Sequence, residues 1–118
     1  MTLGQHQEAF AQDLATLVLH AISVGYRVRM GEVERTLEQQ QIYYNTGRSK
    51  TMNSRHITGH AVDLYPTSKA GKDWAPSDFA PIVSAMKAAA KELGIALVHG
   101  ADWGWDHPHH ELNRAIYP

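Results

Sequence analysis

Two short stretches of the chain hold the residue types that could bind a metal ion. Residues 54–64, Ser-Arg-His-Ile-Thr-Gly-His-Ala-Val-Asp-Leu, place two imidazoles and a carboxylate among small residues. Residues 106–111, Asp-His-Pro-His-His-Glu, bring further imidazoles and carboxylates near the C-terminus. Neutral histidine nitrogens and carboxylate oxygens suit zinc, and a catalytic zinc site uses three protein ligands and leaves a fourth position for water. We interpret each stretch as one half of such a site.

The first stretch has to turn if both of its groups are to reach one metal ion. His56 and Asp63 are seven positions apart, which is too far for one helical face, and Gly59 lies between them. Glycine permits the turn that this spacing requires. Alone, the pair is also typical of a loop histidine and a solvated or capping carboxylate. The second stretch weakens that alternative.

In the second stretch, His109 is the candidate third ligand and Asp106 is a carboxylate left over for chemistry. Residues three apart on a strand point to opposite faces, so Asp106 is expected in the turn before the strand, where Pro108 and residues 103–105, Trp-Gly-Trp, favour irregular backbone. The alternative is a surface turn with incidental histidines. Four more histidines are interpreted as surface groups or as supports behind the ligands, although one of them could replace a chosen ligand: His60, His99, His107 and His110.

The bulk composition is that of a globular protein with an unremarkable charge. The chain has 118 residues, which predicts one domain over residues 1–118, and its 43% hydrophobic content argues against disorder. Eleven Lys and Arg against twelve Asp and Glu give a net charge of -1, so neither nucleic acid nor an anionic membrane is an expected partner. The absence of cysteine excludes disulfides and thiolate ligands.

The N-terminal region carries no sign of an export signal. It lacks a basic segment, and its apolar residues are interrupted by Glu8, Gln12 and Asp13. No run approaches the roughly 20 apolar residues of a membrane span. We therefore expect a protein made in the cytoplasm, without a signal peptide or a stable membrane association.

The spacing of apolar residues predicts the elements that must position these groups. Steps of three and four predict helices over residues 5–24, from 36 to 47, and from a start between 77 and 81 to a stop at 94. Strands are predicted over residues 26–33, 60–65, 95–98 and 108–112, and loops over 48–53, 66–77 and 100–105. Arg35 then lies at a strand-to-helix corner. Three helices interleaved with four short strands predict an α+β domain with a small, largely antiparallel sheet.

The two metal-binding stretches also carry a family resemblance. The patterns S-x-H-x-x-G-x-A-x-D and D-x-P-H-x-E-L, in this order, resemble the zinc peptidases of the D-Ala-D-Ala and hedgehog-like fold. The resemblance is greatest to phage endolysins that act as L-alanyl-D-glutamate endopeptidases. It runs from Tyr26 to Leu112 and includes Arg35-Thr36-x-x-x-Gln40, Tyr43-Tyr44 and Gly47-Arg48-Ser49.

The resemblance implies a role for each candidate residue. It implies zinc bound by His56, Asp63 and His109, with Asp106 as the catalytic acid and base and Arg35 as a cation near the substrate or its oxyanion. A salt-bridge or helix-flanking role for Arg35 is an equal alternative. Trp103 and Trp105 are expected in the cleft or in the core. The chain departs from the family in its short segment between residues 100 and 106 and at His110, where Phe is usual.

The implied function is hydrolysis of the peptidoglycan stem peptide between L-Ala and D-Glu by a monomer that reaches the wall after release from the host cytoplasm. A D-Ala-D-Ala carboxypeptidase or dipeptidase of the same fold is the first alternative, because the ligand motif is shared. A zinc-stabilised binding module is the second. Asp106 argues against the second, because a structural zinc site closes its fourth position and has no use for a free carboxylate beside it.

Overall fold

The structure is a computed structural model that describes residues 2–23, 25–66 and 75–116. It confirms the predicted α+β class, with three helices and a four-stranded antiparallel sheet among these residues. The elements, in chain order, are α1 (Leu3–Ser23), β1 (Val28–Met30), α2 (Leu37–Asn45), β2 (Ala61–Pro66), α3 (Pro76–Leu93), β3 (Leu97–His99), the short 3-10 helix η1 (Gly100–Trp103) and β4 (His109–Leu112). Most of the loop predicted over residues 66–77 lies outside the described residues.

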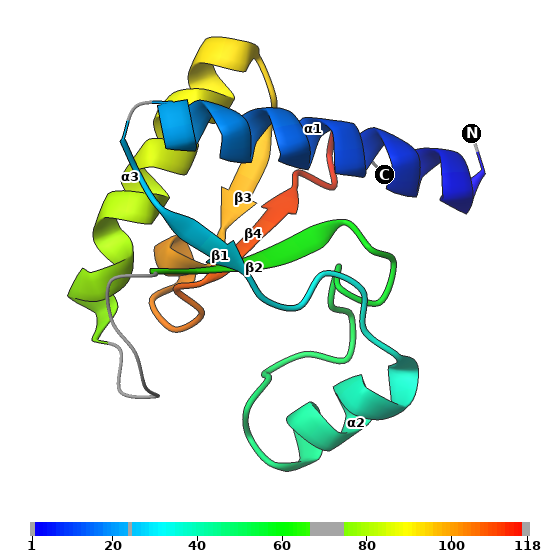
Figure 1. Ribbon diagram of the computed structural model, residues 1–118. Coiled ribbons are helices and arrows are strands. Elements are labelled where there is room, and N and C mark those ends of the chain that lie inside the picture. Colours follow the sequence, from blue (N-terminus) through cyan, green and yellow to red (C-terminus); the bar gives the residue numbers. More distant parts are fainter. Residues whose placement is uncertain (1, 24, 67–74, 117–118) are drawn as a thin grey trace.

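The sheet has the strand order β1-β2-β4-β3, and every neighbouring pair is antiparallel. The C-terminal strand β4 therefore lies between β2 and β3 in the middle of the sheet (Figure 1). In the register of β2 with β4, Asp63 is directly opposite His109. Directly opposite residues have Cβ atoms about 5 Å apart on the same face, so this register brings the two predicted halves of the site together.

Helices α1 and α3 pack against each other and against the sheet, whereas α2 lies on the other side (Figure 1). Their apolar stripes supply the core, as predicted, together with Val62, Leu64 and Leu112 from β2 and β4. Ile22 and Leu93 are exceptions, because they continue the apolar spacing of α1 and α3 but are 50% and 40% exposed. Each lies in the last turn of its helix and lacks the i+3 and i+4 neighbours that cover an interior side chain.

Local hydrogen bonds confirm the predicted helix ends. The Thr2 hydroxyl accepts a bond from the Gln5 amide at 3.2 Å, and Gln5 Oε1 accepts one from the Thr2 amide at 2.8 Å, which completes a capping box. Thr36 Oγ1 accepts from the Gln39 amide at 3.1 Å and begins α2. Gly94 ends α3 with a φ of 70°, in the left-handed region that glycine adopts at little cost.

Strand β1 is shorter than the predicted 26–33, because regular pairing with β2 ends at Met30. The chain stays beside β2 through a Gly31 amide bond to the Asp63 carbonyl at 2.7 Å and an Asp63 amide bond to the Glu32 carbonyl at 3.0 Å. A Cβ atom on Gly31 would lie 2.5 Å from the Tyr65 ring. A side chain at position 31 would displace the Tyr65 ring, so the small size of glycine lets this ring lie against the segment.

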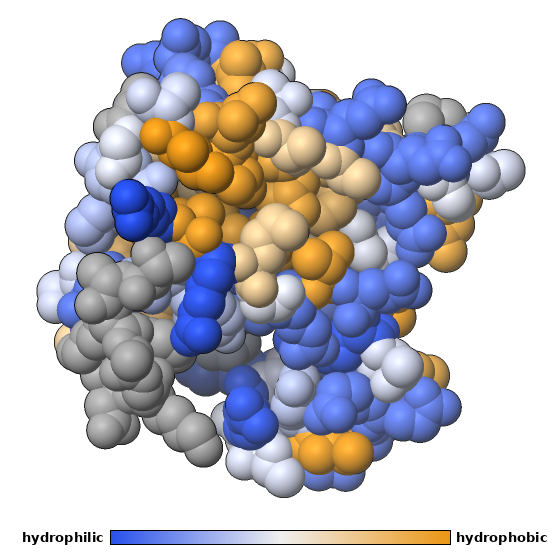
Figure 2. Space-filling model, in the orientation of Figure 1, coloured by the Kyte–Doolittle hydropathy of each residue, from blue (hydrophilic) through white to orange (hydrophobic). Residues whose placement is uncertain are grey.

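The surface divides by polarity. Apolar side chains gather over α1 and β1, whereas the region around α2 is mainly hydrophilic (Figure 2). The exposed apolar residues of α1 and β1 include Leu19, Ile22 and Met30. Within the described ranges, no helix is both long and apolar enough to cross a membrane.

Candidate active site

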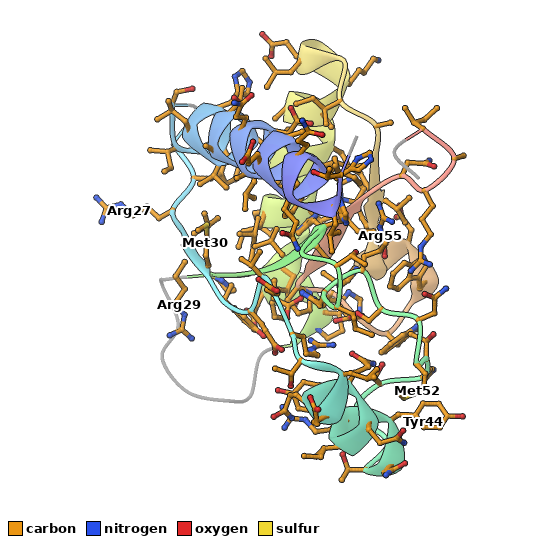
Figure 3. All side chains as sticks on the ribbon, turned by 90° about the vertical axis from the view of Figure 1, so that its right-hand side faces the viewer. Arg27, Arg29, Met30, Tyr44, Met52 and Arg55 are labelled. Atoms are coloured by element: carbon orange, nitrogen blue, oxygen red, sulfur yellow. The ribbon has the colours of Figure 1, made fainter. Side chains whose placement is uncertain are left out.

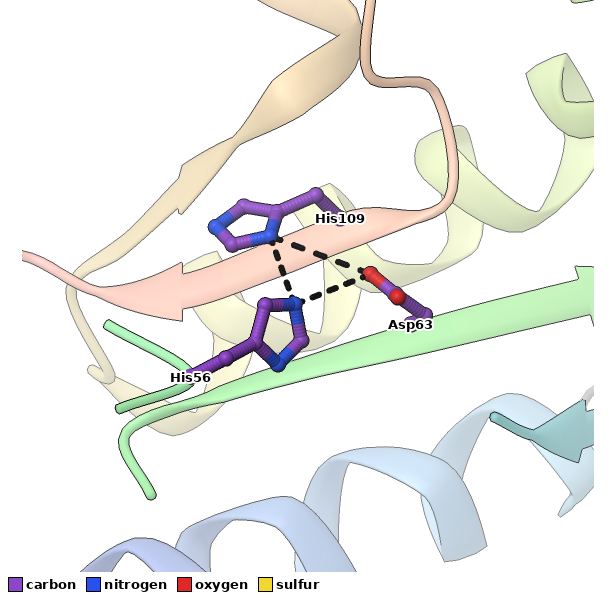
Figure 4. Close-up of side chains that lie close together, drawn as sticks. All are labelled: His56, Asp63 and His109. Atoms are coloured by element: carbon purple, nitrogen blue, oxygen red, sulfur yellow. Dashed lines mark hydrogen bonds and ion pairs between the residues drawn. The ribbon is translucent and has the colours of Figure 1, made fainter. Parts of the chain in front are cut away.

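The structure brings His56, Asp63 and His109 together (Figure 4), and Asp63 and His109 line a cleft. His56 Nε2 lies 3.2 Å from Asp63 Oδ1 and 3.1 Å from His109 Nδ1, and His109 Nδ1 lies 3.8 Å from Asp63 Oδ1. All three side chains are buried. Among the described residues, these three form the group of histidines and carboxylates close enough to share one metal ion.

The spacing of the three atoms fits a tetrahedral metal site. Ligands at 2.0–2.1 Å from zinc, separated by tetrahedral angles, lie about 3.3 Å from one another. The observed 3.1, 3.2 and 3.8 Å bracket that value. Two nitrogens and one carboxylate oxygen are also the donor set of a catalytic zinc site with one open position. The residues present therefore fit a metal ion.

The outward-facing imidazole nitrogens are held by other groups. His56 Nδ1 lies 2.8 Å from the Val33 carbonyl, and His109 Nε2 lies 2.9 Å from Glu111 Oε1. Each acceptor favours a proton on the outward nitrogen, so the inward nitrogen keeps its lone pair for a metal. Burial lowers the pKa of His56, but the hydrogen bond and the charge of Asp63 outweigh it and raise this pKa above its ordinary value.

Asp106 lies next to the group formed by His56, Asp63 and His109 but is not part of it. As predicted, it precedes β4 in an irregular segment, and its Oδ2 is 3.7 Å from His109 Nδ1. A Cβ atom at position 100 would clash with the Asp106 carbonyl, so Gly100 lets the backbone of this segment pass close by. Burial raises the pKa of Asp106, which Asp63 raises further, while His109, His56 and Arg35 lower it. The net result is a pKa of Asp106 above its ordinary value. A raised pKa is typical of carboxylates that act as acids and bases in active sites.

Arg35 makes the salt bridge expected of its structural alternative and also lines the cleft. Its Nε lies 2.6 Å from Glu32 Oε1 and its Nη1 lies 2.6 Å from Gln40 Oε1, and the guanidinium covers the Tyr43 ring at 4.7 Å. Gln40 is fully buried and its Nε2 donates to the Thr51 carbonyl at 2.6 Å. These bonds fix the plane of a cation that lines the cleft. The salt bridge with Glu32 therefore holds the Arg35 guanidinium in its orientation at the cleft.

The cleft holds about 750 Å³ and is lined by both charged and aromatic side chains. Trp103 and Trp105 stack with ring centroids 6.1 Å apart, and the other neighbour of Trp103 is the His109 ring at 5.1 Å. Lys50 lies over the Trp105 ring at 5.1 Å. Both tryptophans therefore line the cleft, and Trp103 lies next to the candidate ligand His109.

The other four histidines considered from the sequence lie outside the metal-binding group. His60 Nδ1 bonds Thr58 Oγ1 at 2.7 Å, His99 Nδ1 lies 2.8 Å from His110 Nδ1, and His107 stacks on Phe79. The surface interpretation is wrong for three of them, because His60, His99 and His110 are buried. His110 alternates with His109 along β4 and points to the other face. Burial and the charges of His99, His109 and Lys87 lower the pKa of His110 to about 3.

Several cleft residues were not recognised from the sequence. Tyr65 lines the cleft, and burial, with the charges of Asp63 and Asp106, raises its pKa to about 12. The alternation of β2 could have found it, because Tyr65 follows Asp63 by two positions on the same face. Glu32 and Arg114 also line the cleft, and nothing in the local sequence pattern marks them.

A buried group of two imidazoles and a carboxylate, open to a cleft beside a fourth charged group, is the arrangement expected of a metallopeptidase. The family model described as phage L-alanyl-D-glutamate peptidase matches residues 3–117. The chain belongs to this family, and the resemblance seen in the two motifs is confirmed.

Three relatives show the extent of the similarity. The chain is 41% identical over 66 residues to the L-alanyl-D-glutamate peptidase of Escherichia phage T5, a match that covers 54% of this chain and 48% of the relative. It is 35% identical over 99 residues to the enzyme of the same name from Listeria phage A118, covering 80% of this chain and 34% of the relative. The chain thus spans half or less of these two relatives. The crystal structure of the Serratia marcescens L-Ala D-Glu endopeptidase ChiX superposes with a TM-score of 0.79 at 32% identity, covering 91% of this chain and 83% of that one.

Proposed function

We propose that this chain is a zinc-dependent endopeptidase that hydrolyses the bond between L-Ala and D-Glu in the peptidoglycan stem peptide. The observation that carries the proposal is the convergence of His56, Asp63 and His109 beside a cleft that is lined by Asp63, His109 and Asp106. The named activities of the T5, A118 and Serratia marcescens relatives point to the same bond.

In the proposed site His56 Nε2, Asp63 Oδ1 and His109 Nδ1 hold the zinc. When bound, zinc supplies a Lewis acid that lowers the pKa of water to about 7 and polarises the carbonyl of a peptide bond. The three ligands leave room for water and substrate because the cleft opens above them. The buried ligands also place this chemistry in surroundings with little bulk water, where electrostatic effects are stronger.

Asp106 is the proposed general base and general acid. Its carboxylate accepts a proton from the attacking water and then returns that proton to the departing D-Glu amine, so the group ends in its starting state. Partial burial suits this task, because the raised pKa of Asp106 makes the proton easier to accept than it is for an exposed aspartate. Its place beside His109, and outside the group of three, leaves its oxygens available for proton transfer.

Arg35 and Tyr65 are proposed to bind the substrate carbonyl or a neighbouring carboxylate. Arg35 is held by Glu32 and Gln40, so its cation is oriented before the substrate arrives. Tyr65 has a pKa of about 12 and keeps its phenolic proton at neutral pH, so it can donate a hydrogen bond. Both side chains line the cleft that contains Asp63 and Asp106.

The choice of bond is proposed to come from cations that fix the carboxylates of the stem peptide. Arg48 and Arg114 line the cleft with Arg35, and Lys50 lies over Trp105 in its wall. Arginine binds carboxylates in a two-point geometry that sets orientation as well as affinity. Cations that hold the peptide on either side of the scissile bond would fix its carbonyl beside His56, Asp63 and His109.

All proposed ligands and catalytic groups come from one chain, which supports action as a monomer. A member of a phage peptidase family is made in the host cell. The proposed route is therefore synthesis in the host cytoplasm and action on the wall after release. The net charge of -1 supports neither nucleic acid nor an anionic membrane as a partner.

Digestion of purified sacculi tests the proposal directly. Zinc-loaded protein should release material with new D-Glu amino termini, identified by labelling of free amines and analysis after acid hydrolysis. Protein treated with a chelator should release none, and added zinc should restore release. Free D-Ala or D-Ala-D-Ala without new D-Glu amines would replace the proposal with a carboxypeptidase or dipeptidase. An intact sacculus that retains the protein would replace it with a binding module.

A further inference from the structure

Glu111 is a buried carboxylate to which the proposed reaction gives no task. Its side chain comes from β4, the strand that also carries His109, and the two residues are only 5% and 3% exposed. Burying a carboxylate is costly unless it is paired or hydrogen-bonded. The partners of Glu111 therefore indicate why the carboxylate is placed there.

Glu111 contacts the side of His109 that faces away from the metal-binding group. Glu111 Oε1 lies 2.9 Å from His109 Nε2, while His109 Nδ1 faces His56 and Asp63. An ionised carboxylate can only accept a hydrogen bond, so this contact requires the proton of a neutral His109 to be on Nε2. The same contact leaves the Nδ1 lone pair directed at the metal position.

The second oxygen of Glu111 is near a cation. Glu111 Oε2 lies 3.6 Å from Arg114 Nε, and Arg114 Nη2 donates to the Asn53 carbonyl at 2.5 Å. Arg114 thereby ties Glu111 to the loop that precedes the first ligand stretch. The contacts with His109 and Arg114 thus engage both oxygens of the Glu111 carboxylate.

The other imidazole ligand is oriented differently. His56 Nδ1 donates to the Val33 backbone carbonyl at 2.8 Å, an acceptor that no side-chain substitution removes. His109 instead depends on one side chain. The two ligands must also present different ring nitrogens, because His56 faces the group with Nε2 and His109 with Nδ1.

We propose that Glu111 is a positioning residue that fixes His109 in the Nε2–H tautomer and so makes Nδ1 available to the metal. This inference rests on metal binding in the proposed function and goes beyond its ligand set and proton-transfer group. A carboxylate behind a histidine ligand also makes that ligand more basic, and losing such a partner typically weakens metal binding about 10- to 100-fold.

The decisive variant is Glu111→Gln, which keeps the shape of the side chain. An amide can accept from Nε2–H or donate to Nε2, so it no longer selects one tautomer. We expect zinc to bind 10 to 100 times more weakly than in the wild type, measured by competition with a chromophoric chelator. Nitrogen-15 NMR of metal-free protein, at a pH where both imidazoles are neutral, should show Nε2–H at His109 in the wild type and a mixture of tautomers in the variant.

Glu32→Gln is the matched control. Glu32 lines the same cleft but bonds Arg35 and Tyr43 and neither histidine of the metal group. Its zinc affinity and His109 tautomer should equal those of the wild type. Equal zinc affinity for Glu111→Gln and wild type would overturn the proposal, as would an Nδ1–H tautomer in the wild type. If Glu111→Gln does not fold, the wild-type tautomer alone decides.

These measurements use zinc alone and no substrate, so they separate this proposal from the proposed function. Failure to find D-Glu termini, with zinc affinity and tautomer as expected, would refute only the endopeptidase assignment. An unchanged zinc affinity in Glu111→Gln, with D-Glu termini produced by the wild type, would refute only the role of Glu111.

Discussion

His109 Nδ1 lies 3.1 Å from His56 Nε2, although the two residues are 53 positions apart in the chain. The outward nitrogens of both rings face acceptors, Glu111 and the Val33 carbonyl. With a proton on each outward nitrogen, the two inward lone pairs would face each other beside the Asp63 carboxylate, an arrangement that a bound cation would stabilise. Metal binding and folding should consequently be coupled in this protein.

The first prediction concerns the metal itself. His56→Ala removes one of the three ligand atoms, so the purified variant should hold little zinc, whereas the wild type should hold one equivalent by elemental analysis. Zinc should also raise the melting temperature of the wild type and not that of the variant. His107→Ala is the control, because His107 stacks on Phe79 away from the metal group and should leave zinc content unchanged. A full equivalent in His56→Ala would show that the ligand set is wrong.

The second prediction separates catalysis from metal binding. Asp106→Asn keeps the size of the side chain but cannot accept a proton, so sacculus digestion should fall about 10²- to 10⁴-fold while zinc content stays at one equivalent. Asp102→Asn is the matched control, because Asp102 is exposed and pairs with Lys87 at 2.6 Å. That control should digest sacculi like the wild type. Loss of zinc in Asp106→Asn would make Asp106 a ligand.

The third prediction concerns the shape of the Arg35 cation. Arg35→Lys keeps the charge but cannot bond Glu32 and Gln40 at once, so the cation loses its fixed orientation. We expect kcat/KM on a soluble stem peptide to fall about 10- to 100-fold, the value of one to two charge-assisted hydrogen bonds. Zinc content should not change.

Arg27→Lys provides the control for this variant, because Arg27 points away from the body of the protein (Figure 3). Its kcat/KM should match the wild type. Equal values for Arg35→Lys and Arg27→Lys would show that Arg35 has only a structural role in holding α2 beside the sheet.

The fourth prediction is a pH dependence of stability. His110 has a pKa of about 3 in the folded protein, because burial and then the charge of His99 disfavour its protonated form. In the unfolded chain the value is about 6.5. The unfolded state therefore takes up the proton first as the pH falls. Above about pH 6.5, His110 is neutral in both states and the free energy of unfolding does not depend on its protonation. Between about pH 6.5 and pH 3, protonation of the unfolded chain lowers the free energy of unfolding by up to about 1.4 kcal/mol per pH unit.

His110→Phe tests this dependence, since it places the usual residue of the family at that position. Urea unfolding of metal-free protein between pH 8 and pH 4.5 should show a smaller loss of stability in the variant than in the wild type. Metal-free protein is needed so that zinc release does not contribute to the difference. Parallel pH dependences for the two proteins would show that His110 is not the group that takes up the proton.

The sequence by itself determined the elements and the chemistry of the ligands. Apolar spacing predicted the helices, and the Thr2 and Thr36 caps depend on hydrogen bonds within one turn, so local sequence is sufficient to specify them. His56, Asp63 and His109 were recognisable as candidate ligands because only a few residue types bind metal ions. The extent of the domain, residues 1–118, stays a prediction.

The tertiary structure decided which groups support these ligands. The pairing of Asp63 with His109 is a register between strands far apart in the chain, and no local pattern states it. The same holds for the contact of Glu111 with His109 Nε2 and for the Glu32 and Gln40 bonds to Arg35. Local sequence selects residue types and backbone turns, whereas hydrogen bonds, burial and pKa shifts between distant residues exist only after the sheet has formed.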